Sequence, residues 1–293
     1  MRQSHGFTCI SAIFKPCNLR SLISPFDALT PKPMSSQILV DVADQTATLI
    51  LSNPEKLNAI DAAMWRALRE SFERAVADPE VRCIILRGDG DKAFAAGGDL
   101  KEFLTIRATK DDAMHYHEEL VARALDAIRT CPKPTIAAIQ GACIGGGLEI
   151  AGCCDIRIAG ESSKFGAPIN KLGFSMYPGE MAGLVALAGP AVVLEILLEG
   201  RILDAHEAYA RGLLSRIVPN DVVFDEARAS ARRIASGAPL VASWHKQWIA
   251  RLMHDKPLSE AEKRSAFAFL DTEDYKEGMS AFFEKRKPVF RGR

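Results

Sequence analysis

Short apolar runs and longer amphipathic segments alternate along most of the chain. The apolar runs predict strands at Ile38–Val42, Thr46–Leu51, Cys83–Leu86, Thr135–Ile139 and Ile156–Ala159, the first two as a pair. Helices are predicted at Ala62–Ala77, Asp111–Arg129 and Gly147–Cys153, and the chain beyond Glu180 is largely helical. Strands separated by helices indicate an α/β fold with buried parallel strand pairing.

The first 33 residues differ from the rest of the chain. They carry four basic residues and four prolines but only one acid, Asp27, and show no sustained periodicity. Either Met34 is the true start, which we favour, or residues 1–33 are an organellar transit peptide. In both cases we expect this leader to be disordered and outside the fold. We expect residues 34–225 to form the core with the ligand site, and residues 226–293 a helical region for oligomerisation.

Composition excludes some classes of function. Of the 293 residues, 48% are hydrophobic, which is enough for a large core, and 37 basic residues balance 37 acidic ones. This balance gives no sign of nucleic acid or an anionic membrane as a partner. The longest apolar stretches, such as Ala182–Ala188, are far shorter than a bilayer span requires, which predicts a soluble protein. Seven cysteines without a CxxC pair indicate reduced thiols rather than a disulfide framework.

Two glycine-rich junctions carry the candidate chemistry. The first, Ala93–Lys101, leads from a strand through Ala96, Gly97 and Gly98 into a helix that begins near Asp99. Small side chains let a ligand approach the backbone, and amides at a helix start point outward without partners. Taken alone, this segment is also explained as a turn with Asp99 as an ordinary helix N-cap.

The second junction, Gly141–Ile150, also leads from a strand through glycines into a helix. It lacks the GxGxxG spacing of a dinucleotide-binding loop, and no Gly-Lys-Ser/Thr follows as in a P-loop. Its three successive glycines allow a backbone amide at the helix start to face a developing negative charge. Glu149 lies one turn into this helix, where it either reaches the same ligand or only complements the helix dipole.

Together the junctions can offer two amides to one carbonyl oxygen, and this pairing resembles the enoyl-CoA hydratase/isomerase (crotonase) family. Ala93–Phe103 is similar to the first motif of that family and Gly141–Asp155 to its second. The resemblance extends from about Val40 to the C-terminus. It implies a crotonase-like spiral of ββα units with a helical C-terminal region that forms trimers, usually assembled as a hexamer of two trimers.

The resemblance also implies roles for individual residues. Gly98 and Gly146 would donate the two oxyanion-hole amides. Lys101 and Lys285 would bind the phosphates of coenzyme A, and Lys285 could come from a neighbouring subunit. The alternative for each lysine is an ordinary solvated surface charge. Further substrate-binding positions carried over in this way are Ala59, Ala96, Asp99, Leu100, Ile169 and Phe282. Neither a metal nor a redox cofactor is implied, and coenzyme A is part of the substrate.

One position departs from the hydratase pattern. A typical family hydratase has a second glutamate twenty residues after the first, and here that position is Ile169, which cannot transfer a proton. Tyr177 aligns with an acid of some family isomerases, so Tyr177 or Glu180 is the candidate replacement. Alternatively, Tyr177 packs in the acyl pocket and Glu180 complements the helix that begins near Pro178. His115 and His117 are two apart on a helix, which sends their rings to different sides and argues against a metal pair.

The resemblance implies an acyl-CoA-binding enzyme that stabilises a thioester enolate, with each amide contributing about 3 kcal/mol to the transition state. We expect an enoyl-CoA hydratase-type lyase in fatty-acid or other acyl-CoA breakdown, with Glu149 as the general base for water. One alternative is isomerisation or decarboxylation with a single acid, and another is a non-catalytic acyl-CoA-binding protein. We expect a cytoplasmic homotrimer or hexamer, or a mitochondrial matrix protein if the leader is a transit peptide.

Overall fold

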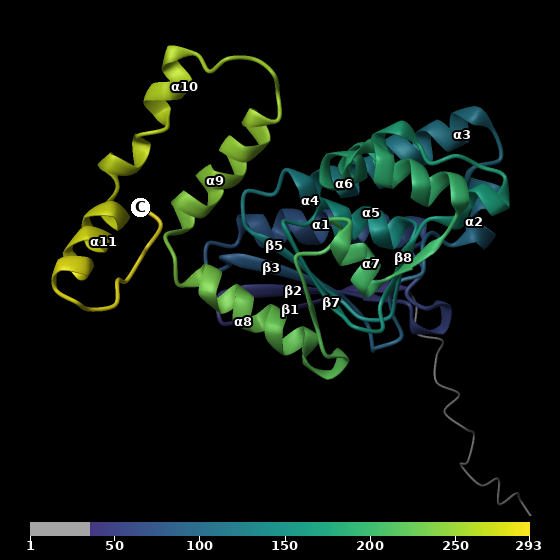
Figure 1. Cartoon of the computed structure of the whole chain (residues 1–293), viewed down its shortest axis with the longest axis horizontal. Coiled ribbons are helices and arrows are strands. Elements are labelled where there is room, and N and C mark those ends of the chain that lie inside the picture. The colour runs from purple at the N-terminus through teal and green to yellow at the C-terminus, as the bar shows by residue number, and fades with distance from the viewer. Residues whose placement is uncertain (1–35) are drawn as a thin grey trace, which may run out of the picture. The chain divides into compact units, whose positions relative to one another are not determined.

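The larger sheet of the protein has six strands within residues 36–293, the part of the chain that a computed structural model describes (Figure 1). In spatial order they are β1 (Gln37–Ala43), β2 (Thr46–Ser52), β3 (Cys83–Gly88), β5 (Thr135–Ile139), β7 (Ile156–Gly160) and β10 (Arg216–Val218). β1 and β2 pair antiparallel, whereas the other neighbours pair in parallel. The predicted strand pair and the parallel pairing are both confirmed. The leader lies outside the described residues.

A second, smaller sheet was not predicted. Its strands are β4 (Ala93–Ala95), β6 (Ala142–Ile144), β8 (Lys164–Gly166) and β9 (Ile202–Asp204), in that spatial order. Each is too short to show a period of its own. β4 and β6 pair in parallel, with Ala93 opposite Ala142, so the two glycine-rich junctions leave neighbouring strands.

The first half of the chain holds most of the helices that surround the site. They are α1 (Ala62–Ala77), α2 (Leu100–Ile106), α3 (Lys110–His115), α4 (Arg123–Arg129) and α5 (Gly146–Cys153), with short 3₁₀ helices η1 (Pro54–Lys56) and η3 (Pro168–Leu172). α1 matches its predicted bounds. The helix predicted at Asp111–Arg129 is instead interrupted by a π-helical segment, η2 (Tyr116–Ala122), which shifts the facing of the residues that follow.

The remaining helices follow in the second half. They are α6 (Pro178–Glu199), α7 (Ala205–Ala210), η4 (Asn220–Val222), α8 (Val223–Ala235), α9 (Pro239–Leu252), α10 (Glu260–Ser265), η5 (Ala268–Asp271) and α11 (Glu273–Phe283). The expectation that no apolar stretch is long enough for a bilayer is wrong for α6, which meets that criterion by length and composition. Gly189 leaves helical geometry at φ 78°, ψ 163°, and with Pro190 it kinks α6. Leu184, Val193 and Ile196 of this helix are buried in the described fold.

Buried side chains cover both faces of the large sheet. Alternate residues of β3 point to opposite sides: Ile84 and Leu86 join the cluster that includes α1, whereas Cys83 and Ile85 join the cluster under α8. Burial of each such Ile or Leu side chain contributes roughly 1.5–3 kcal/mol. The large sheet is therefore fixed between two helical layers, whereas the junctions after β4 and β6 leave neighbouring strands of the small sheet.

The five cysteines of the described part are all free. Burial raises the pKa of Cys83 and of Cys153 to about 12, so these thiols stay protonated. The described cysteines agree with the expectation of reduced thiols rather than a disulfide framework. Cys9 and Cys17 lie outside the described residues.

The C-terminal helices expose much apolar surface. α9 has no buried residue, and Phe267 and Phe282 are 61% and 76% exposed. Trp244 and Trp248 line an apolar hollow between α9 and α11. Arg82 ties the end of the chain to the sheet by donating hydrogen bonds to the carbonyls of Ala235 and Phe290. Trimer formation through this region stays a prediction.

Candidate active site

The two glycine-rich junctions pack directly against each other. Gly97 has φ 106° and Gly145 has φ 50°, a region that side chains disfavour. A Cβ on Gly97 would lie 3.4 Å from the carbonyl oxygen of Ile144, and one on Gly145 would lie 3.6 Å from the Cα of Gly97. Glycine is thus favoured at both positions by the positive φ of the turns, and the two backbones lie in van der Waals contact.

This approach brings two free amides to one pocket. Backbone hydrogen bonds of the two neighbouring residues fix the position of Gly98. The Ile60 amide donates to the Gly97 carbonyl at 2.8 Å, and the Asp99 amide donates to the Ile60 carbonyl at 2.9 Å. Gly146 begins α5, where helical amides lack intrahelical acceptors. Within residues 36–293 neither the Gly98 amide nor the Gly146 amide donates to a protein acceptor, and both residues line the same pocket.

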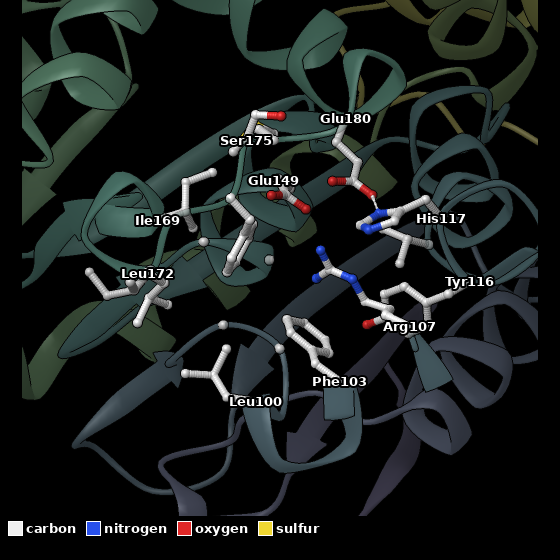
Figure 2. Close-up of a pocket in the computed structure, with 18 of the residues that line it drawn as sticks. Leu100, Phe103, Arg107, Tyr116, His117, Glu149, Ile169, Leu172, Ser175 and Glu180 are labelled. Carbon is white, nitrogen blue, oxygen red and sulfur yellow. Dashed lines mark hydrogen bonds and ion pairs between the residues drawn. The ribbon is translucent and has the colours of Figure 1, made fainter. Parts of the chain in front are cut away.

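Figure 2 shows this pocket and the side chains that point into it. Its wall is mostly apolar and aromatic, and includes Trp65, Phe103 and Ile169. The polar side chains that line it are those of Arg107, Tyr116, His117, Glu149, Ser175 and Glu180. An apolar cavity with a few convergent polar groups is typical of a small-molecule site.

Two carboxylates lie together in this pocket. Glu149, in the first turn of α5, is 8% exposed, and Glu180, in the first turn of α6, is 6% exposed. Burial, and then the nearby charge of Glu180, raises the pKa of Glu149 well above its usual value. The Glu149 carboxyl therefore keeps its proton more readily than an exposed glutamate does. Nδ1 of His117 is hydrogen-bonded to Oε1 of Glu180 at 2.5 Å, which orients that carboxylate.

Comparisons with known proteins agree with this geometry. Residues 43–293 match the family model described as enoyl-CoA hydratase/isomerase. The chain belongs to this family. A crystal structure of an enoyl-CoA hydratase/carnithine racemase from Magnetospirillum magneticum superposes with a TM-score of 0.86 at 50% identity, covering 88% of this chain and 97% of the other. The predicted family and crotonase-like α/β fold are confirmed.

Two curated relatives of the enoyl-CoA hydratase/isomerase family cover nearly the same span. A probable enoyl-CoA hydratase of Mycobacterium tuberculosis is 38% identical over 86% of this chain and 97% of its own length. The (E)-benzylidenesuccinyl-CoA hydratase of Thauera aromatica is 36% identical over 87% of this chain and 99% of its own length. The family assignment therefore rests on the whole core and supports a role in acyl-CoA metabolism.

Seven of the residues that the family resemblance selected line the pocket. They are Ala96, Gly98, Leu100, Gly146, Glu149, Ile169 and Glu180. Tyr177 does not line it. Its ring stacks on His117 at 5.4 Å between centroids, and its hydroxyl donates to Glu118 at 2.6 Å. Of the two candidates for the missing acid, only Glu180 therefore faces the pocket.

The other selected residues lie outside the lining. Asp99 caps α2 by accepting from the Lys101 amide, and Lys56 pairs with it at 2.5 Å and lowers its pKa. Ala59 is buried beside the pocket wall, and Lys101 is exposed at the start of α2. Both Phe282 and Lys285, at the end of α11, are exposed. The contacts of these residues with coenzyme A stay predictions.

Sequence reasoning missed His117 and Arg107. It set His117 aside because residues two apart on an α-helix face different sides, and it considered only metal binding. His117 and Glu180 are 63 positions apart, so no local spacing connects them. The π-helical segment η2 turns His117 toward Glu180, but no sequence pattern marks this change of helical period.

Proposed function

We propose that the protein is an enoyl-CoA hydratase-type lyase that adds water across the 2,3 double bond of a 2-enoyl-CoA thioester. The observation that carries the proposal is the pair of Glu149 and Glu180 in the pocket onto which the amides of Gly98 and Gly146 open. The hydratase names of relatives at 36–38% identity support the same reaction. Neither a metal nor a redox cofactor is required, and coenzyme A enters as part of the substrate.

In the proposed reaction the thioester oxygen accepts hydrogen bonds from the Gly98 and Gly146 amides. The oxygen of water bonds to the β-carbon, and the π electrons move onto the thioester oxygen to form an enolate. Each amide stabilises that charge by about 3 kcal/mol. The enolate then collapses as the α-carbon takes a proton, so the elements of one water molecule are added.

A pair that shares one proton provides both groups for this exchange. The ionised carboxylate takes a proton from water, and the protonated one delivers its proton to the α-carbon. The pair ends with one proton, now on the other carboxylate. We assign the two roles to the pair as a unit, since both carboxyl groups line the same pocket. Glu180 thus replaces the acid that Ile169 cannot supply.

The test is turnover of a panel of 2-enoyl-CoA thioesters that includes crotonyl-CoA. We expect Glu149→Gln and Glu180→Gln each to lower kcat by roughly 10²–10⁴-fold, as for loss of a general acid or base. Both variants should still bind butyryl-CoA, because glutamine is nearly isosteric. Glu73→Gln on the exposed face of α1 is the matched control and should be unchanged. Undiminished turnover in either active-site variant would refute the paired mechanism.

Isomerisation of a 3-enoyl-CoA is the second candidate, and the apolar side chain of Ile169 favours it. Because the side chain of Ile169 cannot transfer a proton, Glu149 and Glu180 would only move a proton between the α- and γ-carbons of the acyl chain. A 3-enoyl-CoA substrate separates the reactions, since isomerisation yields a 2-enoyl product and no 3-hydroxy product. Binding of butyryl-CoA without turnover of any thioester, including malonyl-type substrates for decarboxylation, would favour the non-catalytic alternative.

A further inference from the structure

The pocket holds a guanidinium group that the proposed hydration does not use. Arg107 is the C-cap residue of α2, and its side chain points into the pocket (Figure 2). Across residues 36–293 only two buried side-chain polar atoms lack a hydrogen-bond partner, and Nη1 of Arg107 is one of them. A buried charged donor without an acceptor is costly, so such a group calls for an explanation.

Aromatic rings hold this guanidinium in one orientation. Its Cζ lies 4.2 Å from the centroid of Phe103 and 4.8 Å from that of Phe174. The two rings meet edge to face at 79°. Stacking on a ring occupies the face of a guanidinium and leaves the N–H groups at its edge available. The Phe103 ring also lies against Gly98, where a Cβ would be 2.7 Å from Cζ of Phe103, so one ring contacts both Arg107 and an oxyanion-hole residue.

The acidic groups of the pocket do not neutralise Arg107. Glu180 is bonded to His117, and Arg107 takes part in none of the ion pairs within the described part of the chain. The pKa of Glu149 is raised by burial and by Glu180, with no opposing effect of Arg107. Tyr116 also lines this pocket, and burial raises its pKa and keeps its hydroxyl protonated.

We propose that the acyl chain of the substrate carries a carboxylate, and that Arg107 binds it through its free N–H donors. The planar guanidinium fork matches a carboxylate in a bidentate arrangement, and its charge persists at physiological pH. Position favours the acyl chain over the phosphates of coenzyme A, since Arg107 shares an apolar wall with Phe103 and Phe174 next to the oxyanion amides. The inference rests on the proposed function and narrows its substrates to dicarboxylic acyl-CoA thioesters.

Binding of unreactive saturated thioesters tests the inference without turnover. The probes are succinyl-, glutaryl- and adipyl-CoA, each compared by calorimetry with the neutral thioester in which an isopropyl group replaces the carboxylate. For at least one chain length we expect the wild type to bind the carboxylated thioester about 10²-fold more tightly. Arg107→Met should abolish that preference, and Arg107→Lys, which keeps the charge but loses the fork, should keep part of it.

Arg69→Met is the matched control, because Arg69 lies on α1 away from the pocket and pairs with Glu73. It should keep the full preference. Equal binding of both thioesters by the wild type at all three lengths would overturn the inference, as would an equal loss of both on Arg107→Met. A preference for the carboxylated ligand without hydration of any enoyl thioester would refute only the proposed function, and hydration without the preference would refute only the carboxylate site.

Discussion

Replacement of Glu149 by glutamine should change how the stability of the protein depends on pH. Glu149 is buried at the start of α5, and its pKa is raised well above the usual value of 4.5 by burial and by Glu180. In the unfolded chain the same carboxyl returns to its usual pKa. Between these two values the native state binds more protons than the unfolded state, so the free energy of unfolding falls as pH rises. Glutamine removes this dependence.

The size of the effect follows from proton linkage. One group contributes a slope of at most about 1.4 kcal/mol per pH unit within that window. For a folded part of this size, such a change corresponds to roughly 2–3 °C in Tm. The difference in Tm between Glu149→Gln and the wild type should therefore increase steadily above pH 4.5 and level off above the raised pKa of Glu149.

Thermal unfolding of both proteins from pH 5 to pH 9 measures this difference. Glu73→Gln removes a carboxylate whose side chain is 55% exposed and should show a nearly constant difference across the range. If the Glu149→Gln difference is also constant, or shrinks as pH rises, Glu149 does not have a raised pKa and the paired-carboxylate mechanism loses its basis.

Three further predictions concern packing, the second acid and assembly. Gly147→Ala should lower Tm by several degrees, because its Cβ would lie 2.5 Å from the carbonyl oxygen of Ala95. Gly183→Ala, whose Cβ would lie 3.4 Å from a thiol, should not. Adding Ile169→Glu to the Glu180→Gln variant should raise its turnover at least tenfold, measured on the best 2-enoyl-CoA substrate. If turnover does not rise, the side chains at positions 169 and 180 face different parts of the substrate. Sedimentation at micromolar concentration should show a trimer or hexamer, and a monodisperse monomer would contradict the role given to α9 and α11.

The fold was predictable where apolar segments are long. The five predicted strands agree with the structure within two residues at each end. Four of them bury most of their side chains in the large sheet, whereas β1 lies at its edge, is largely exposed and was marked by its apolar run beside β2. The strands of the small sheet have three residues each and leave no pattern. The π segment Tyr116–Ala122 was equally hidden, since one extra residue in a helical turn is stabilised by tertiary packing rather than by composition.

The glycine junctions were predictable for a different reason. At Gly97, Gly145 and Gly147 the backbone needs positive φ or a neighbour closer than any side chain allows, and only glycine meets such a demand. The partners of Glu180 were not predictable, because they come from distant segments that tertiary packing alone brings together. The same holds for Arg107, whose unpaired guanidinium becomes informative only once its surroundings are known.

The position of the second acid shows why a substitution at Ile169 need not abolish the chemistry. A proton donor has to reach the α-carbon, and its place in the chain is irrelevant if the geometry permits transfer. Glu149 and Glu180 lie in the first turns of α5 and α6, and both helix starts border the pocket. Burial and the nearby charge of Glu180 raise the pKa of Glu149 and so favour its protonated form. Either carboxylate can thus hold the charge in turn, as a reversible addition of water requires, and the wall at Ile169 is left free to contact the acyl chain.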